Sequence, residues 1–287
     1  MIRNHHLRCI KVSLFLLLCL LLPGTAAAQA AQDNTELHTD DGLWVITNLE
    51  PLFSEQDDRG RLTGYAVELV RLILADAGFN NNILSAPWQR ILAESAEKPD
   101  VLVFSLARTP EREDQFYWIT PVTQNTYAFY ALQGHSNGVS SLTALPKTSR
   151  VAVLENDFRH KALEKAGIKA VPTQSWGEAL QALYNGQADY LFFSDGGVNV
   201  TCANSGFDCT RIKKAFVYQQ ATTYVALSKP GTNPALAERL KQAARSVKSA
   251  EQYTSLVNEW LATYAKRTAL PISEENGVLI LGQVNAD

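Results

Sequence analysis

The chain has 287 residues, of which 46% are hydrophobic and 19% are charged, and its formal net charge at pH 7 is −3. Loss of the basic residues of the N-terminal segment described below would move that net charge to about −6. A mildly acidic chain of this kind is not expected to bind nucleic acid.

The N-terminus has the order of a secretory signal peptide. Arg3, Arg8 and Lys11 precede an apolar run at residues 12–22, and a helix-breaking Pro-Gly pair and small residues follow it. The apolar run is short for a membrane span, and no later stretch is apolar enough to form one. The sequence therefore predicts a signal peptide at residues 1–28, and a soluble product exported to the periplasm without a lipid anchor.

Strands and helices alternate along the rest of the chain. Apolar, β-branched runs predict strands at residues 42–48, 100–106, 149–156 and 188–195. Apolar residues at helical spacing predict helices at residues 64–79, 157–167 and 175–187, and one or two helices in residues 233–265. Strands that alternate with helices of this length indicate an α/β fold with largely parallel sheets.

Two cysteines follow the signal peptide, Cys202 and Cys209. In an oxidising compartment, a close pair around a loop that contains Gly206 predicts a local disulfide, and two free buried thiols are the alternative. A zinc site is not expected, because no second Cys or His pair accompanies them.

Two similar aromatic, β-branched stretches, at residues 126–132 and 223–227, suit strands that cross between two lobes. The segment between them has its own set of strands and helices. We therefore predict a discontinuous first lobe, residues 33–128 plus 225–270, an inserted second lobe, residues 129–224, and a hinge formed by the crossing strands.

The chain carries, in matching order and spacing, the segments GRLTGYAVELVRLILADAG, PWQRIL, DVLVFSLARTPERE, VAVLEND and EALQALYNGQADYLFFSD. In these it resembles the extracellular solute-binding proteins of family 3, the periplasmic receptors of polar amino-acid uptake systems, over about residues 42–265. The resemblance implies a two-lobed type II periplasmic binding fold, with mostly parallel sheets flanked by helices. It also implies closure on a small polar ligand, an amino acid or a related amine or carboxylate. The tail at residues 271–287 extends past the family's usual end, either as an added strand on the first lobe or as a free segment.

The resemblance assigns a ligand role to Arg112, because the arginine that ends the family's T-x-E-R element grips the ligand carboxylate. A guanidinium presents a planar fork of donors that matches a carboxylate. Arg108, four residues earlier, is a second candidate ligand contact, although a place on a charged surface turn suits it better. Ser105 lies where the family supplies a small polar contact, at the end of a predicted strand.

Asp195 matches the family's acidic residue for the ligand amine, and its alternative role is to start a turn before Gly196 and Gly197. Trp88 stands where the family places an apolar side chain against the ligand. It either stacks on the ligand or anchors the core.

Three positions depart from the family pattern. Glu50 replaces an aromatic residue, Ala107 replaces a serine, and Asn156-Asp157 replaces the Gly-Thr pair at a helix start. Asp157 either caps the free N–H groups of that helix itself or repels an anion. The two acids Glu50 and Asp157 favour a cationic ligand, although a ligand with both a carboxylate and an amine is the first expectation.

The same scaffold also serves the cyclohexadienyl dehydratases, which are exported enzymes, and sensor modules. Glu50 with a raised pKa would suit the acid or base of a dehydratase. The sequence has no metal-spaced cluster, phosphate loop or catalytic triad order. We therefore expect a monomeric receptor without a cofactor or metal, not an enzyme, whose partner is an inner-membrane ABC permease.

Overall fold

The computed structural model describes residues 42–135 and 138–281, so the signal peptide predicted at residues 1–28 lies outside the described residues. The helices of this part are α1 Tyr65–Asp76, α2 Trp88–Glu97, α3 Phe158–Ala166, α4 Trp176–Tyr184, α5 Asp195–Ala203, α6 Pro234–Lys248 and α7 Glu251–Thr268, with 3-10 turns η1 Pro110–Arg112 and η2 Cys209–Arg211. The strands are β1 Trp44–Thr47, β2 Glu55–Gln56, β3 Leu62–Thr63, β4 Ile83–Ser85, β5 Val101–Ala107, β6 Phe116–Leu132, β7 Arg150–Leu154, β8 Lys169–Thr173, β9 Tyr190–Ser194, β10 Ile212–Ser228, β11 Ile272–Glu275 and β12 Val278–Leu281.

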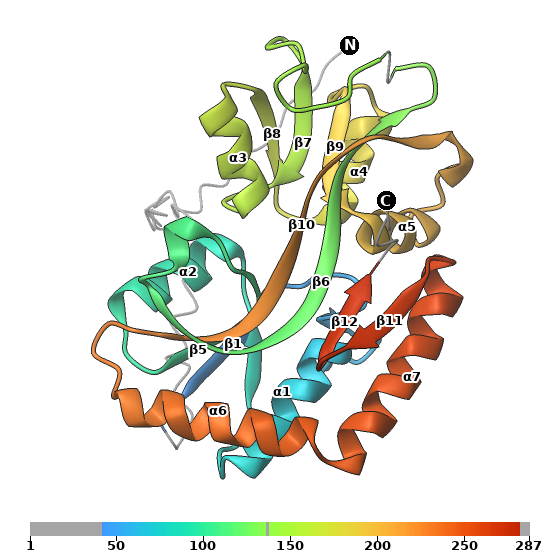
Figure 1. Ribbon diagram of the computed structural model, residues 1–287. Helices are drawn as coiled ribbons and strands as arrows, with labels where there is room; N and C mark the ends of the chain where they lie inside the picture. The colour runs from blue at the N-terminus through green and yellow to red at the C-terminus, as the bar shows by residue number, and fades with distance from the viewer. Residues whose placement is uncertain (1–41, 136–137, 282–287) are drawn as a thin grey trace, which may run out of the picture. The chain divides into compact units, whose positions relative to one another are not determined.

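The main sheet has the strand order β4-β1-β5-β10-β6-β9-β7-β8. Strands β4, β1 and β5 run parallel to one another, and so do β9, β7 and β8. We call the first group, together with helices α1, α2, α6 and α7, the first lobe. We call the second group, together with helices α3, α4 and α5, the second lobe. The parallel groups, with helices against them (Figure 1), confirm the predicted α/β fold.

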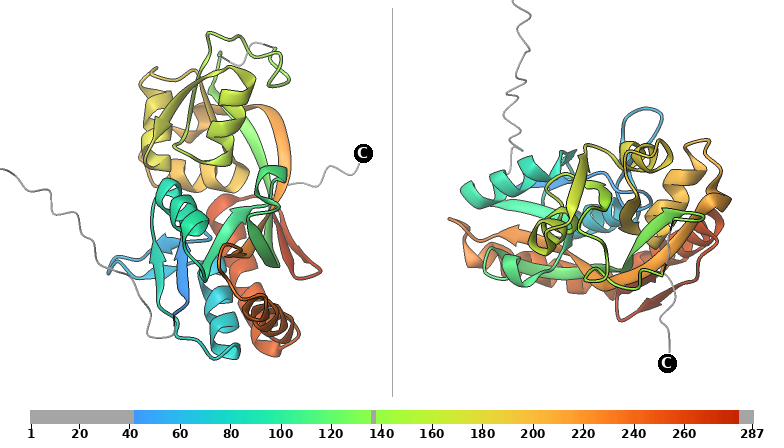
Figure 2. Two further views of the ribbon diagram at one scale, coloured as in Figure 1. Left: turned by 90° about the vertical axis from the view of Figure 1, so that its left-hand side faces the viewer. Right: turned by 90° about the horizontal axis from the view of Figure 1, so that it is seen from above.

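The long strands β6 and β10 connect the lobes. They pair antiparallel along nearly their whole length, from Ile212 opposite Leu132 to Ser228 opposite Phe116. One end of β10 pairs with β5 of the first lobe, and Tyr127–Tyr130 of β6 pair with β9 of the second lobe. Figures 1 and 2 show the two strands side by side through both groups. The stretches predicted to cross between lobes lie within these strands; the lobe boundaries and the hinge remain predictions.

Local sequence explains where the second-lobe helices begin and end. The side chain of Asp157 caps α3, and that of Ser175 caps α4, each by accepting a hydrogen bond from a backbone N–H of the first turn. Gly167 ends α3 in the left-handed conformation. Asn156, before α3, also has a positive φ of 58°, which Asn tolerates better than most residues.

Three apolar clusters form the core of the described residues. In the first lobe, α1, α6 and α7 bury residues such as Val70, Leu240 and Val257 against β1 and β5. In the second lobe, α3 packs Leu163 against β7 and β9. A further apolar cluster joins residues of both lobes, including Trp88 and Trp176.

Two further sequence predictions, the disulfide and the tail, have clear outcomes. Cys202 and Cys209 form a disulfide, as predicted, which ties the end of α5 to η2. The described part of the tail is not free: β11 and β12 form a hairpin, and β12 pairs parallel with β6 at Thr123–Asn125.

Candidate functional site

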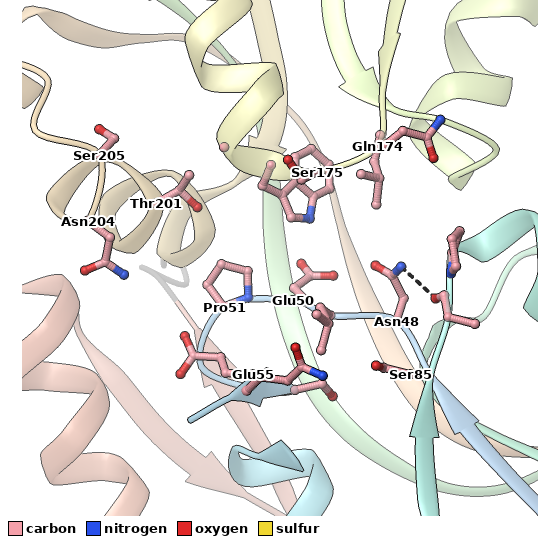
Figure 3. A pocket seen from close by; sticks show the side chains of 18 residues that line it. Asn48, Glu50, Pro51, Glu55, Ser85, Gln174, Ser175, Thr201, Asn204 and Ser205 are labelled. Carbon is pink, nitrogen blue, oxygen red and sulfur yellow. Dashed lines mark hydrogen bonds between the residues drawn. The ribbon is translucent and has the colours of Figure 1, made fainter. Parts of the chain in front are cut away.

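Two cavities lie between first-lobe and second-lobe segments. The first, of about 630 Å³, is lined by residues 48–51 after β1, residues 85–87 before α2, and residues of α4 and α5, and Figure 3 shows Glu50 among the side chains that line it. The second, of about 740 Å³, is lined by residues 108–112 and by residues of α3 and β10. Glu50 lines the first cavity and Arg112 the second.

Arg112 is a buried cation on the wall of the second cavity. Pro110 starts the 3-10 turn η1, and Arg112 ends it. The side chain is only 7% exposed, and its Nη1 donates to the carbonyl of Ala107 at 3.0 Å. Among the described residues, no carboxylate lies within 4.0 Å of this guanidinium. Burial lowers the pKa of Arg112, and the more distant Asp157 opposes that shift. The site thus holds a desolvated cation without an ion-pair partner.

Arg108 has the opposite environment. Its side chain is 40% exposed, and its Nε donates to Glu113 at 2.9 Å. The guanidinium also lies over the rings of Trp118 and Tyr224. Arg108 lines the second cavity, but its charge is already paired, which matches the surface role that the sequence favoured.

Trp88 lies near Arg112, whereas no hydrogen bond joins the Ser105 side chain to Arg112, and neither Ser105 nor Trp88 lines one of the two cavities. Ser105 has a φ of +57° at an irregular point of β5, where the pairing with β10 shifts register. The Trp88 ring lies 6.0 Å from the guanidinium carbon of Arg112. Both side chains are buried, and the Oγ of Ser105 and the Nε1 of Trp88 have no hydrogen-bond partner among the described residues. Such atoms are costly unless a ligand or water satisfies them.

The N-terminus of α3 is closed by its own side chains. Asp157 Oδ1 accepts from the backbone N–H of Arg159 at 2.9 Å, and His160 Nδ1 accepts from that of Asn156 at 3.1 Å. Of the two alternatives for Asp157, the structure therefore shows capping.

Arg159 forms the centre of a buried charge cluster. It is 1% exposed, its Nε lies 2.5 Å from Asp157 Oδ1, and its Nη2 lies 3.9 Å from Glu50 Oε2. The Trp176 ring lies 4.2 Å from the guanidinium carbon. Burial alone would lower the pKa of Arg159, but the two carboxylates raise it above its usual value. Arg159 is therefore a fixed cation between the two cavities.

Glu50 stands in a tight turn after β1. The backbones of Glu50 and Ser54 form an isolated bridge, and a Cβ at Gly64 would lie 2.4 Å from the Phe53 carbonyl, so only glycine fits beside this turn. Burial raises the pKa of Glu50, while Arg159 opposes the shift. Its Oε1 has no hydrogen-bond partner within the described ranges.

The structure does not bring Asp195 to Arg112. Asp195 opens α5, and its carboxylate accepts from the hydroxyl of Tyr130 and, at 2.6 Å, from Lys214 Nζ. It lines neither cavity. Arg112 and Trp88 are thus neighbours, Glu50 and Asp157 meet through Arg159, and Asp195 has separate partners.

Comparison with known proteins identifies the family. The family model of the bacterial extracellular solute-binding proteins, family 3, matches residues 43–263. The chain belongs to this family.

Two relatives of this family 3 protein share about a quarter of its residues over the matched region. The L-cystine-binding protein TcyA of Bacillus subtilis is 23% identical over 63% of this chain and 72% of the relative. The putative ABC transporter arginine-binding protein 2 of Escherichia coli is 24% identical over 73% and 86%, respectively. The crystal structure of a mutant of ArgBP from T. maritima matches with a TM-score of 0.66 and 19% identity, covering 77% of this chain and 95% of that one. This likeness confirms the two-lobed periplasmic binding fold.

Within the described residues of this family 3 protein, no group of three or more His, Cys, Asp or Glu side chains is placed to hold a metal ion. No helix found there combines the length and apolar character that a membrane span requires.

Arg159 and Trp176 of this family 3 protein were not among the site residues predicted from the sequence. A usable signal existed for Arg159, because it lies four residues before Leu163, and these two are the buried residues of α3. Helical spacing thus puts the arginine on the inward face. Trp176 follows the capping Ser175 directly, but its contact with Arg159 depends on tertiary packing.

Proposed function

We propose that this solute-binding receptor takes an amino acid as its ligand and delivers it to an inner-membrane ABC permease. The observation that carries the proposal is Arg112, a buried guanidinium without an acidic partner on the wall of a cavity between the lobes. An unpaired buried charge is expensive, and a ligand carboxylate meets the guanidinium with two parallel hydrogen bonds. The cystine and arginine named for the relatives carry such a carboxylate.

The charge on the second cavity supports an anionic group at this place. Arg112, Lys161, Lys165 and Arg108 line the cavity with Glu111 as the acidic residue of the lining. A cleft lined by one sign of charge attracts the opposite charge and speeds association. Ser105 and Trp88 do not line this cavity, and they are proposed as neutral contacts because each has a buried polar atom without a partner among the described residues.

For the ligand amine, the acceptor we propose is Glu50 Oε1, which is buried and has no partner in the described part of the chain. Because Glu50 lines the first cavity and Arg112 the second, this pairing requires that the lobes move to bring the two side chains to one ligand. Asp195 is the alternative acceptor, and its use requires that Lys214 leave the carboxylate. The Lys214 side chain is 42% exposed, so water can solvate its ammonium group once it leaves Asp195. Asp157 is proposed to act through Arg159 rather than on the ligand.

Export through residues 1–28 and a periplasmic location complete this proposal. They agree with the extracellular character of the family, and they place the ligand site where a permease partner receives it.

A thermal-shift screen of the protein against the twenty amino acids, polyamines and small carboxylates tests the proposal. A ligand that binds only the folded state stabilises it by about 2.7 kcal/mol at a hundred times its dissociation constant. A shift with an amino acid, without turnover, supports the receptor. Shifts confined to polyamines, or to carboxylates without an amine, would contradict it.

One observation favours a second candidate, the dehydratase. Burial raises the pKa of Glu50, as a general acid in a dry cleft requires. Incubation with a cyclohexadienyl acid and chromatography of the products test this function. If the parent forms product and Glu50→Gln does not, the protein is a dehydratase rather than a receptor. If the substrate remains intact, the dehydratase function is excluded.

A further inference from the structure

The charge cluster around Arg159 bears on which amino acids fit, and this step rests on the proposed function. Arg159 belongs to the second lobe and contacts residues of both cavity linings: Glu50 and Trp176 line the first cavity, and Phe158 lines the second. It is 1% exposed, so its charge is desolvated with that of its neighbours.

We infer that Arg159 is a specificity-determining residue, because its guanidinium neutralises the carboxylates of Glu50 and Asp157. The receptor then binds amino acids with uncharged side chains and rejects those with a second cationic group. Without Arg159, Glu50 and Asp157 would leave two carboxylates for a ligand with two positive charges. With Arg159 present, Asp157 is bound through Nε at 2.5 Å and through Nη2 at 3.1 Å, and Glu50 lies 3.9 Å from the same side chain.

A count of charges supports the inference. The cluster contains one cation, Arg159, and two acids, Glu50 and Asp157, and Arg112, which feels the charges of Asp157 and Arg159, adds a second cation. A zwitterion adds one charge of each sign, so the positive and negative charges of the site and ligand together remain equal in number. An arginine or lysine ligand would add a further buried cation without a partner, which is costly in a desolvated site.

The geometry adds a steric and chemical reason. The guanidinium of Arg159 lies over the Trp176 ring at 4.2 Å and near the Tyr127 ring at 5.0 Å. Arg159 thus occupies the aromatic, acidic surroundings that suit a guanidinium or ammonium group. A cationic ligand side chain would have to displace it. The protein therefore differs in expected ligand from the relatives named for arginine.

Calorimetry with L-glutamine and L-arginine tests the inference, because these ligands have side chains of similar reach and different charge. The parent should bind glutamine at least tenfold more tightly than arginine. Arg159→Gln should move the ratio of the two affinities towards arginine by tenfold or more, and Glu50→Gln/Arg159→Gln should reverse that gain. Arg150→Gln is the control, since Arg150 is paired with Asp189 outside both cavities, and it should keep the parent ratio.

Arg159→Lys keeps the positive charge and should still bind glutamine more tightly than arginine. If circular dichroism shows that Arg159→Gln is unfolded, the affinity ratio of Arg159→Lys is the test, and a ratio that favours arginine would overturn the inference. A parent that binds arginine as tightly as glutamine would overturn the inference, and so would an Arg159→Gln protein that folds and keeps the parent ratio. In both cases the proposed function stands, because an amino acid binds. If none of the twenty amino acids binds the parent or the variants, the proposed function fails and the inference fails with it.

Discussion

The Glu50 carboxylate lies 3.9 Å from the Arg159 guanidinium, although Glu50 follows a strand of the first lobe and Arg159 belongs to a helix of the second. Both side chains are buried, at 9% and 1% exposure. Asp157, on the same helix as Arg159, completes the cluster at 2.5 Å. Buried charges of this kind stabilise a protein only as long as every partner is present.

Asp157→Asn should therefore lower the free energy of unfolding by about 3–5 kcal/mol, because it leaves Arg159 with an incomplete set of counter-ions. Asn caps a helix about as well as Asp, so the change removes the charge and retains the cap. Urea unfolding followed by circular dichroism measures the effect.

Asp189→Asn is the matched control for this change. Asp189 also accepts from a backbone N–H and from an arginine, Arg150, but its side chain is 36% exposed. An exposed pair of this kind contributes about 0–1 kcal/mol. Equal losses in the two variants would show that burial does not strengthen the Asp157 pair.

Arg112→Ala should weaken binding of the ligand found in the thermal-shift screen by about 2–5 kcal/mol, the range for truncating one partner of a buried charge pair. Arg112→Lys should restore little of it, because a point charge does not reproduce the guanidinium fork. Calorimetry on folded variants measures both. Arg108→Ala, four residues away and already paired with Glu113, should have a smaller effect; if Arg112→Ala binds like the parent, the carboxylate assignment is wrong.

The arrangement of strands and helices could be predicted where the local signal was strong. The apolar spacing of residues 64–79 and the capping Ser175 gave α1 and α4 nearly to their observed ends. Residues 233–265 divide into α6 and α7 at Ser249 and Ala250. The disulfide followed from export and close spacing, and the order of the family segments gave the fold.

Other features depend on tertiary contacts that no short window carries. Helix α5 begins at Asp195 with two glycines, which locally indicate a turn, and it is held by packing and by the disulfide. Strand β6 starts at Phe116, ten residues before the stretch that was recognised, because its first half is stabilised by pairing with β10. The acids Glu50 and Asp157 favoured a cationic ligand in the sequence, and no short window shows that Arg159 contacts both of them.

Mass spectrometry of the unreduced protein should show a mass two hydrogens below the dithiol form, because Cys202 and Cys209 are bonded. Replacing both by alanine should lower the free energy of unfolding by about 2–3 kcal/mol, the loop-entropy expectation for so short a loop. Two thiols that are freely alkylated in the native protein would contradict the bond.

Ligand binding should draw the two lobes together, because β6 and β10 are the long strands shared by both and hinge closure around a ligand is the common response of such folds. Small-angle scattering with saturating ligand should show a smaller radius of gyration than without it. Arg112→Ala at the same ligand concentration is the comparison, and a parent profile that does not change with ligand would point to a rigid receptor.

Lys248→Met should change how the stability of the protein depends on pH. Lys248 ends α6, and its Nζ donates to the carbonyls of Pro121 in β6 and Gly277 in the β11–β12 turn, each at 2.6 Å. Burial lowers the pKa of Lys248 to about 8, with Glu274 opposing the shift. The unfolded value is about 10.4.

Between these two pH values the unfolded chain binds more protons at Lys248 than the folded chain, so this residue makes the free energy of unfolding rise as pH rises. The parent should therefore gain about 2–3 kcal/mol over Lys248→Met from pH 8 to pH 10.4, at about 1.4 kcal/mol for each pKa unit. Urea titrations of both proteins at pH 7.5, 9 and 10 measure the difference between their free energies of unfolding. The contributions of the other titrating groups are the same in both proteins and cancel in this difference. Parallel curves would mean that Nζ remains charged between its two carbonyls, and that the hairpin is held to α6 by an ion rather than by a neutral amine.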